Sequence, residues 1–375
     1  MIRAREFLRI TYQCKGDSMK LPSYEKLTTE RGWFSMTPIL SRGRHLNIIT
    51  GKRSTGKSTG AALYILMDYL KTGKGWIYSR RTKDETDLTC SSWFDNAVDI
   101  LREEGVDVTV EYRGGHYYVN GEKAGRAIPL SLQQKSKGDN LSAYNWIIYD
   151  EFISFDRRYL GGRENPLFEY QALMSLYQTA DRGIGVAHRN EVKIIALGNS
   201  DSYYNPIYMA VGIDRYLTLD THFLAPKNEE WVVEQLRAED ATAAEDYKNS
   251  VSYKLSDERT KDYAYENIAR EQTENEFVEK RTEPMEGICN LIYDGTEMGM
   301  HFSWRDGIFY IDTNKVNKKT YALTTGDHKP AYWLAAGNNS VEEVRQLKLL
   351  YQQGRVRFSN PRVKFCIDNY LHYVI

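Results

Sequence analysis

The sequence predicts an α/β fold in which a mostly parallel sheet carries helices on both faces. Short apolar runs alternate with helical patterns through the first half of the chain, as expected for strands buried on both faces. After Pro284 the pattern changes to short strands separated by tight-turn dipeptides, which favours an antiparallel α+β part. Between the two lies a polar, glycine-poor stretch with a helical pattern. We expect three domains, at residues 1–228, 229–279 and 280–375.

The bulk composition excludes several classes of protein. A chain of 375 residues with 41% hydrophobic content is long enough to build two cores. Its four cysteines form no C-x-x-C pair and its seven histidines do not cluster, which argues against a structural zinc site or a disulfide framework. No apolar run approaches the roughly 18 residues of a transmembrane helix, so we expect no membrane partner. The net charge of −1 hides an acidic middle, because residues 229–283 carry 16 acidic and 8 basic side chains.

The individual elements follow from the spacing of the apolar residues. In the first domain we expect strands at residues 45–49, 76–79, 108–112, 116–119, 146–149 and 192–197, and helices at residues 61–70, 84–104 and 167–180. Asn120-Gly121 is a strong signal for a hairpin turn, and a polar loop is expected at residues 133–140. In the last domain we expect a meander of strands at residues 288–293, 298–304 and 308–311, a helix at residues 341–351 and a short mixed tail.

Residues 51–58 fit the pattern G-x-x-x-x-G-K-[ST] of a phosphate-binding P-loop, with an apolar strand before it and a helix after it. The glycines let backbone N–H groups point at an anion, and the helix N-terminus adds partial positive charge. We expect Lys57 to contact the β- and γ-phosphates of ATP and Ser58 to ligate Mg²⁺. The predicted nucleotide-binding residues are Gly51, Lys52, Arg53, Ser54, Thr55, Gly56, Lys57, Ser58 and Asp150.

Two adjacent acids end the strand expected at residues 146–149. Asp150 has the position of an outer-sphere Mg²⁺ ligand, and Glu151 is where a general base would deprotonate the attacking water. The pair favours ATP hydrolysis over a nucleotide switch, and the lack of an N-K-x-D motif argues against a GTPase. Asn199 follows the strand at residues 192–197 and is a candidate sensor of the γ-phosphate, with an ordinary turn residue as the alternative.

Cations near these motifs are candidates for stabilising the transferred phosphoryl group, which carries spread negative charge. The candidates are Arg53, Arg80, Arg81, Lys83, Arg182 and Arg189, and one of them is a candidate finger for a neighbouring subunit's nucleotide. For any single arginine the alternative is an ion-paired surface side chain. Two loops flanking the catalytic strand are candidates for contact with DNA phosphates, with plain surface loops as the alternative. Their cations are Lys135, Lys137, Arg157, Arg158 and Arg163.

Several of these segments together resemble the genome-packaging ATPases of small short-tailed bacteriophages with protein-primed genomes, the compact relatives of large terminases. The resemblance is carried by residues 53–58, 77–81, 117–131, 148–152, 197–200, 293–295, 310–313 and 321–325. It covers most of the chain and is weakest before Arg44 and across residues 229–279. It implies a P-loop ATPase domain of the ASCE type, similar to RecA and to terminases.

The resemblance also implies a biological setting. Subunits of this family form a ring, expected to be a pentamer, on the portal of an empty capsid and drive double-stranded DNA into it, and a packaging RNA can link ring and portal. The protein is then expected in the host cytoplasm, transiently at the portal vertex of the procapsid and not in the mature virion. By motif position Arg182 matches the trans-acting finger, with Arg189 as the alternative, and Lys83 matches a second cation acting across the interface.

The C-terminal domain resembles an RNase H-like nuclease, the cutting domain of large terminases. Cleavage of that kind needs several carboxylates converging on two metal ions. Asp294, Asp312, Asp327 and Asp368 are available, but the sequence gives no convincing cluster, so we expect a degenerate nuclease that binds DNA or RNA without cutting. The alternatives are a terminase with an active nuclease and a nucleotide-gated, non-enzymatic DNA-binding adaptor.

Overall fold

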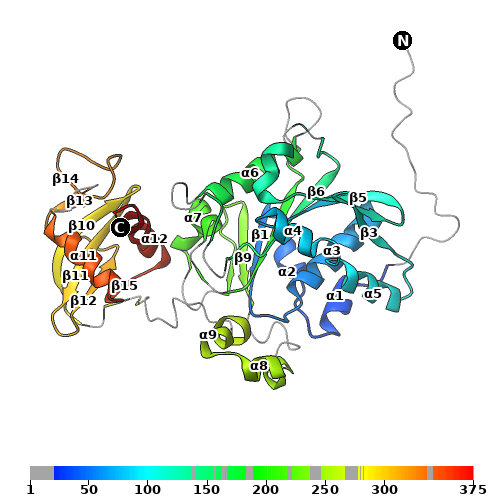
Figure 1. The fold of residues 1–375 in the computed structure, drawn as a ribbon, viewed down its shortest axis with the longest axis horizontal. Helices are drawn as coiled ribbons and strands as arrows, with labels where there is room; N and C mark the ends of the chain where they lie inside the picture. The colour runs from blue at the N-terminus through cyan, green and yellow to red at the C-terminus, as the bar shows by residue number, and fades with distance from the viewer. Residues whose placement is uncertain are drawn as a thin grey trace, which may run out of the picture.

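A computed structural model describes residues 21–136, 138, 140–154, 158–161, 165, 167–182, 189–200, 202–203, 205–217, 222–236, 246–266, 278, 280–281, 283–335 and 341–374. Two separate β-sheets organise the chain, a large one in the N-terminal part and a smaller one in the C-terminal part (Figure 1). None of the helices in these residues is long and apolar enough to span a membrane.

The large sheet has the strand order β3-β4-β5-β2-β6-β7-β1-β9-β8. Its strands are β1 (Leu46–Thr50), β2 (Gly75–Ser79), β3 (Val110–Arg113), β4 (His116–Val119), β5 (Glu122–Ala127), β6 (Tyr144–Asp150), β7 (Lys193–Gly198), β8 (Phe223–Leu224) and β9 (Trp231–Gln235). All pairings from β5 to β9 are parallel, and antiparallel hairpins form both ends of the sheet. This confirms the predicted parallel sheet and the hairpin turn at Asn120-Gly121.

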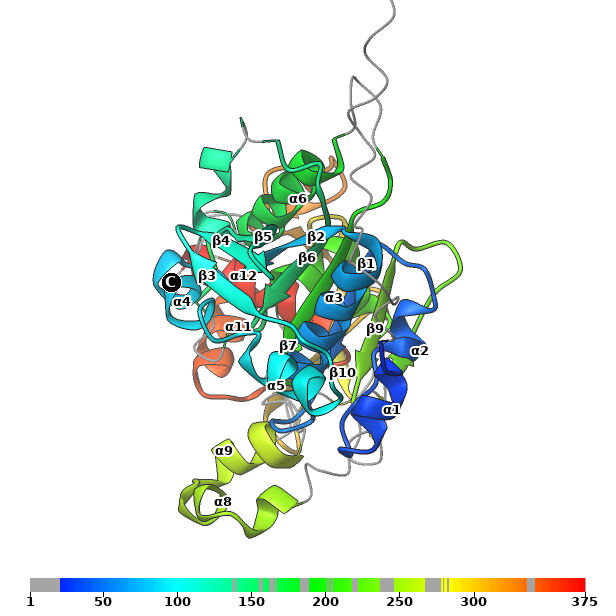
Figure 2. The ribbon, with the colours of Figure 1, turned by 90° about the vertical axis from the view of Figure 1, so that its right-hand side faces the viewer.

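Helices cover both faces of the large sheet. They are α1 (Tyr24–Thr29), α2 (Thr37–Leu40), α3 (Lys57–Thr72), α4 (Lys83–Thr89), α5 (Asp95–Glu103), α6 (Phe168–Asp181) and α7 (Pro206–Val211), with 3₁₀ turns η1 (Leu130–Ser136) and η2 (Ile213–Arg215). Because side chains alternate along a strand, Trp146 and Ile148 of β6 join the core under α3, whereas Ile147 and Tyr149 join the core under α6. Figure 2 shows these two helices on opposite faces.

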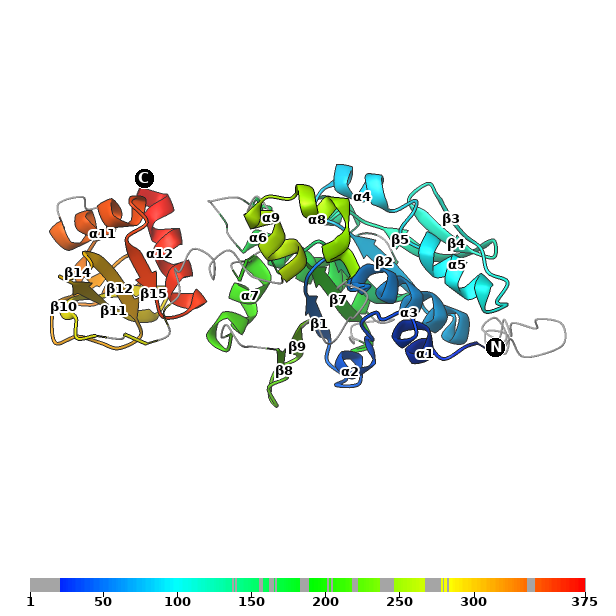
Figure 3. The same ribbon diagram turned by 90° about the horizontal axis from the view of Figure 1, so that it is seen from below.

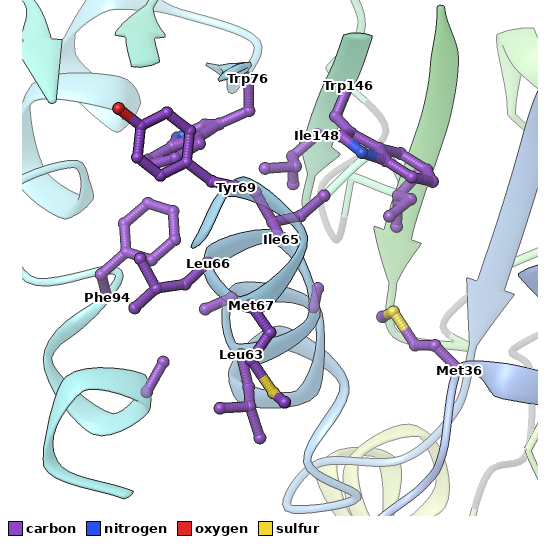
Figure 4. Close-up of a cluster of buried hydrophobic side chains, with 14 of the residues drawn as sticks. Met36, Leu63, Ile65, Leu66, Met67, Tyr69, Trp76, Phe94, Trp146 and Ile148 are labelled. Atoms are coloured by element: carbon purple, nitrogen blue, oxygen red, sulfur yellow. The ribbon is translucent and has the colours of Figure 1, made fainter. Parts of the chain in front are cut away.

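The packing of α3 fixes the position of the loop that precedes it. Leu63, Leu66 and Tyr69 of this helix are buried among strand and helix side chains, as the close-up in Figure 4 shows. Trp76 and Phe94 close the cluster, with ring centroids 4.7 Å apart. A helix held this firmly along its length presents its first turn, and therefore the P-loop, at a defined place.

Two expected elements of the first domain are corrected by the structure. The helix expected at residues 84–104 is two helices, α4 and α5, because the chain turns between them and buries Cys90 and Phe94. The loop expected at residues 133–140 begins inside the 3₁₀ turn η1, where Gln133 and Ser136 are buried.

The boundary expected at residue 228 is also wrong. Residues 231–235 are strand β9, which pairs with β1 along its whole length, so the first domain extends beyond Gln235. The run is fully buried and includes two consecutive β-branched residues, Val232 and Val233, which suit a central strand better than an acidic helix. The helical expectation holds for the described part that follows: η5 (Asp246–Asn249), α8 (Val251–Leu255), α9 (Glu258–Lys261) and the π-helical turn η6 (Asp262–Glu266).

The C-terminal sheet has the order β14-β13-β10-β11-β12-β15. Its elements are β10 (Glu286–Tyr293), β11 (Thr296–Ser303), β12 (Ile308–Asp312), β13 (Thr320–Ala322), β14 (Trp333–Leu334), α11 (Glu342–Gln352), β15 (Val356–Phe358) and α12 (Pro361–Val374). Strands β10 to β12 form the predicted meander. The tail, however, is a strand and a long buried helix instead of a short mixed segment (Figure 3).

Candidate nucleotide-binding and hydrolysis site

The P-loop joins the end of β1 to the start of α3 in a conformation that requires its two glycines. Gly56 has φ +79°, and a Cβ there would lie 2.6 Å from Trp33. Gly51 packs so closely that a Cβ would lie 2.8 Å from that of Leu236. Ser54 also has a positive φ, of 64°. Left-handed residues within a turn point successive backbone N–H groups inward, which makes a concave anion site.

The ammonium group of Lys57 lies at the centre of this turn. It donates hydrogen bonds to the carbonyls of Gly51 at 2.9 Å and Lys52 at 2.7 Å, and to Thr55 Oγ1 at 3.2 Å. Burial lowers the pKa of Lys57 to about 8. The folded loop therefore holds a poorly solvated cation where an anionic ligand would gain most from it.

The predicted acid pair lies at the same edge of the sheet. Asp150 is buried and accepts hydrogen bonds from Tyr78 at 3.0 Å and from Arg80 Nη2 at 3.0 Å. Glu151 follows with φ 57°, and its half-exposed carboxylate lies 3.9 Å from Arg80 Nη2. Desolvation and the neighbouring Asp150 raise the pKa of Glu151, which makes its carboxylate a better proton acceptor.

The candidate sensor joins the site from the next strand. Asn199 Oδ1 lies 3.5 Å from Lys57 Nζ. The end of β7 packs directly on the catalytic turn, because the N–H of Phe152 donates to the carbonyl of Leu197 at 3.0 Å. A Cβ on Gly198 would lie 2.9 Å from the ring of Phe152. The structure therefore brings Lys57, Asp150, Glu151 and Asn199 together as predicted, from the carboxyl ends of parallel strands.

These residues line a cleft of about 540 Å³. Residues 53–59 line it together with Asp150, Glu151 and Asn199, so Arg53 faces the cleft as expected. Trp33 and Asn96 also line it, and sequence reasoning missed both. Neither lies in a recognisable motif: Trp33 reaches the cleft because its segment packs against the P-loop, with the N–H of Phe34 donating to the carbonyl of Thr55 at 3.0 Å.

The other predicted cations do not line this cleft. Lys83 is exposed at the start of α4 and pairs with Asp87. Arg182 is exposed at the end of α6, which runs back across the sheet to the edge away from the P-loop. Arg189 donates to the carbonyls of Ala180 and Ser142, each at 2.6 Å, and so fastens the start of β6 to the end of α6. Because the guanidinium of Arg189 is already bound to these carbonyls, Arg182 is the better candidate for the finger that reaches a neighbouring subunit's nucleotide.

The candidate DNA-contacting cations are only partly described. Lys135 is exposed at the end of η1, and Arg158 is exposed after the catalytic turn. Lys137, Arg157 and Arg163 lie outside the described residues.

The carboxylates of the C-terminal domain have partners of their own. Asp327 accepts the backbone N–H groups of the β10–β11 turn at 2.7 and 2.8 Å and the hydroxyl of Thr324. Asp312 lies 3.2 Å from His301 Nε2 and 3.4 Å from Arg281 Nε. Across residues 21–374, as far as the structure describes them, no three His, Cys, Asp or Glu side chains group as metal ligands.

Comparison with known proteins identifies the family. The model of the podovirus DNA encapsidation protein family (Gp16) matches residues 31–373. This chain belongs to that family. The DNA packaging proteins of Bacillus phages phi29 and B103 are both 26% identical to it, over 339 and 334 residues, which cover 88% and 87% of this chain and 95% and 96% of theirs. The chain is therefore a podovirus DNA encapsidation protein, similar to these DNA packaging proteins.

Solved structures support the same fold across both domains. A chain of the bacteriophage phi29 genome packaging motor assembly matches with a TM-score of 0.66 at 24% identity, covering 92% of this chain and 99% of that one. A chain of the Phi-28 gp11 DNA packaging motor matches with a TM-score of 0.59 at 16% identity, covering 92% and 98%. The fold is therefore shared over nearly the full length of both neighbours.

Proposed function

We propose that this protein hydrolyses ATP in the cleft beside Lys57 and that hydrolysis drives double-stranded DNA into a preformed capsid. One observation carries the proposal: a buried lysine that follows β1 meets a buried aspartate and a glutamate of raised pKa that end β6, at the carboxyl ends of parallel strands separated only by β7. A binding module without turnover needs the phosphate cradle, but it does not need a carboxylate of raised pKa beside it.

The candidate residues predicted for the cleft have separate roles in this proposal. The P-loop amides and Lys57 bind the phosphates, and Arg53 adds positive charge at the rim. Glu151 takes a proton from the attacking water, and Asn199 orients the water or the γ-phosphate. The hydroxyl of Ser58 and the carboxylate of Asp150 are oxygen ligands of the kind that Mg²⁺ prefers, so these two residues would hold it. Bound Mg²⁺ supplies charge neutralisation on the phosphates.

Replacement of Glu151 tests the hydrolytic assignment. We expect Glu151→Gln to bind ATP normally but to lose turnover by about 10²-fold or more, because a positioned base contributes roughly 10²–10⁴. Lys57→Ala should lose nucleotide binding as well. Steady-state ATPase rates in the presence of DNA, with nucleotide binding measured in parallel, check both.

The control is Glu104→Gln, at an exposed acid after α5, which should keep full activity. Normal turnover by Glu151→Gln would exclude Glu151 as the base. Negligible turnover by the wild-type protein with DNA and portal present would instead favour the nucleotide-gated adaptor.

We further propose that the C-terminal domain is an RNase H-like domain that binds nucleic acid without cutting it. Its strand arrangement, an antiparallel meander with β13 and β14 added in parallel beside β10, supports this fold. Trp333 is 57% exposed with the Lys319 ammonium 4.5 Å from its ring centroid, an aromatic and cation pairing suited to unpaired bases of a packaging RNA.

The arrangement of Asp312 and Asp327 opposes metal-dependent cleavage, because two-metal cleavage needs several converging carboxylates and no three His, Cys, Asp or Glu side chains group as metal ligands in the described part of the chain. We expect no nicking of supercoiled DNA by the full chain with Mn²⁺. Nicking that disappears in Asp312→Asn would establish an active nuclease and a terminase-like activity.

A further inference from the structure

A buried ion pair lies directly behind the catalytic turn. Arg81, the second residue after β2, is 7% exposed, and Glu169, in the first turn of α6, is 1% exposed. The guanidinium contacts the carboxylate twice, with Nε to Oε2 at 2.8 Å and Nη2 to Oε1 at 3.3 Å. Neither residue lines the nucleotide cleft, and the chemistry proposed above uses neither.

Arg81 is bound to the main chain of the proposed base. Its Nη2 donates to the carbonyl of Glu151 at 3.2 Å and to that of Phe152 at 3.1 Å. Glu151 has a left-handed backbone conformation, which a residue with a side chain keeps only where its surroundings hold it. The two hydrogen bonds from Arg81, together with the one from the Phe152 N–H to the Leu197 carbonyl, hold this turn and thereby set the direction of the Glu151 side chain.

The same pair is bound to the segment at residues 158–161. Glu169 accepts the backbone N–H of Leu160 at 2.9 Å, and Tyr159 lies with its ring centroid 5.2 Å from the guanidinium of Arg81. The hydroxyl of Tyr149 also donates to Glu169, at 2.5 Å. Residues 158–161 belong to the second of the two loops that the sequence singles out for DNA contact, and Arg158 is exposed on it.

We propose that Arg81 and Glu169 are positioning residues for ATP hydrolysis that couple the base to this loop. Arg81 holds the main chain of Glu151, and Glu169 holds both Arg81 and the main chain of Leu160. A displacement of residues 158–161 by DNA is therefore transmitted through one buried ion pair to the orientation of Glu151. The inference rests on the hydrolytic function proposed for the cleft. It adds the contacts through which bound DNA would change the rate of ATP hydrolysis.

An ion pair that only stabilises the fold would need neither the hydrogen bonds to the main chain of Glu151 and Phe152 nor the contacts with residues 158–161. Removing it would lower stability and leave the kinetics of the remaining folded molecules unchanged. Positioning predicts a different pattern: KM for ATP is retained because the P-loop is intact, whereas kcat falls and loses its dependence on DNA.

Arg81→Lys is the sharpest variant, because lysine keeps the positive charge but lacks the planar fork that reaches the carboxylate and both carbonyls at once. We expect kcat to fall by about tenfold to a hundredfold, a part of the roughly 10²–10⁴ that a positioned base contributes. We expect KM to change by less than about twofold, and the ratio of kcat with and without double-stranded DNA to fall toward one. Glu169→Gln should show the same pattern.

The matched control is Arg102→Lys. Arg102 also joins a carboxylate, that of Asp99 at 3.9 Å, and a backbone carbonyl, that of Val108 at 3.1 Å, but it lies at the surface and does not line the cleft. It should leave kcat, KM and DNA stimulation unchanged. Circular dichroism and thermal unfolding of each variant separate kinetic effects from loss of folded protein.

Two results would overturn the inference: an Arg81→Lys enzyme with wild-type kcat and DNA stimulation, or a loss of kcat that matches the loss of folded protein. If Arg81→Lys fails to fold, Tyr159→Leu decides, because this partly exposed side chain contacts Arg81 and its loss should alter the DNA dependence of kcat. Failure of the proposed function has a different signature, since the wild-type protein itself would then show no turnover.

Discussion

At the level of single residues, the ammonium group of Lys57 determines how the cleft responds to its ligand. Main-chain carbonyls hold it, and burial brings its pKa to about 8, close to physiological pH. Bound phosphates would favour the charged form and raise this pKa. Protonation of Lys57 and nucleotide binding are therefore linked.

We expect ATP binding to take up a proton at and above pH 8. Since the pKa is about 8 without ligand and higher with it, Lys57 is partly neutral before binding and charged afterwards, and affinity should fall as the pH rises through 8. Calorimetric titration of ATP at pH 8 in two buffers of different ionisation enthalpy measures the uptake. Lys57→Arg is the control, because arginine stays charged and takes up no proton. Identical heats in both buffers for the wild-type protein would contradict the linkage.

At the level of elements, the helix α12 shows how the last residues of the chain become part of the core. Lys364 and Asp368 lie one turn apart on it, both almost fully buried and 3.3 Å apart. Tyr351 of α11 contacts the same carboxylate. A buried pair of this kind is costly to break, because removal of one partner leaves the other charge without compensation.

Lys364→Met should lower the free energy of unfolding of the C-terminal domain by about 3–5 kcal/mol, since it leaves the buried Asp368 carboxylate without its cationic partner. The double replacement Lys364→Met with Asp368→Leu should recover most of this loss. Arg345→Met, in an exposed pair with Glu342, is the matched control and should cost at most about 1 kcal/mol. Urea denaturation followed by circular dichroism gives the values, and a single variant as stable as the wild type would refute the argument.

At the level of the whole molecule, the proposed site lies at the carboxyl ends of the parallel strands, and Arg182 lies near their opposite, amino-terminal ends. The crossover helix α6 starts near the catalytic turn and runs back to the start of β7, so Arg182 at its end lies away from its own cleft. In the ring that the resemblance to packaging ATPases implies, an arginine in this position would serve a neighbouring subunit. The expected pentamer, its portal contact and the role of Lys83 depend on the same assembly and stay predictions.

Mixed rings test the action of Arg182 across the interface. Neither Arg182→Ala nor Lys57→Ala subunits should hydrolyse ATP alone with DNA. Mixed in one ring, they should recover part of the activity, because the intact arginine of a Lys57→Ala subunit can complete the intact cleft of an Arg182→Ala neighbour. Arg189→Ala should lower stability instead, since Arg189 ties strand to helix. A mixture with no more activity than its components would count against a trans role.

The sequence by itself determined the cleft and most of the fold. The P-loop, the acid pair and Asn199 each follow an apolar strand, and parallel strands end at one edge, so their meeting was predictable before any contact was known. The resemblance to packaging ATPases was likewise carried by local motifs, and the family match confirms it.

Only the tertiary structure decided what depends on contacts between distant segments. Strand β9 pairs with β1 across a separation of 185 positions between Leu46 and Trp231, and no local pattern in an acidic stretch indicates such a partner. Trp33 reaches the cleft by packing against a glycine, and Arg81 reaches Glu169 across 88 positions. Local patterns fix which surfaces are apolar and where the chain turns. Long-range packing chooses which of those surfaces meet, and it alone placed Arg81 and Glu169 behind the proposed base.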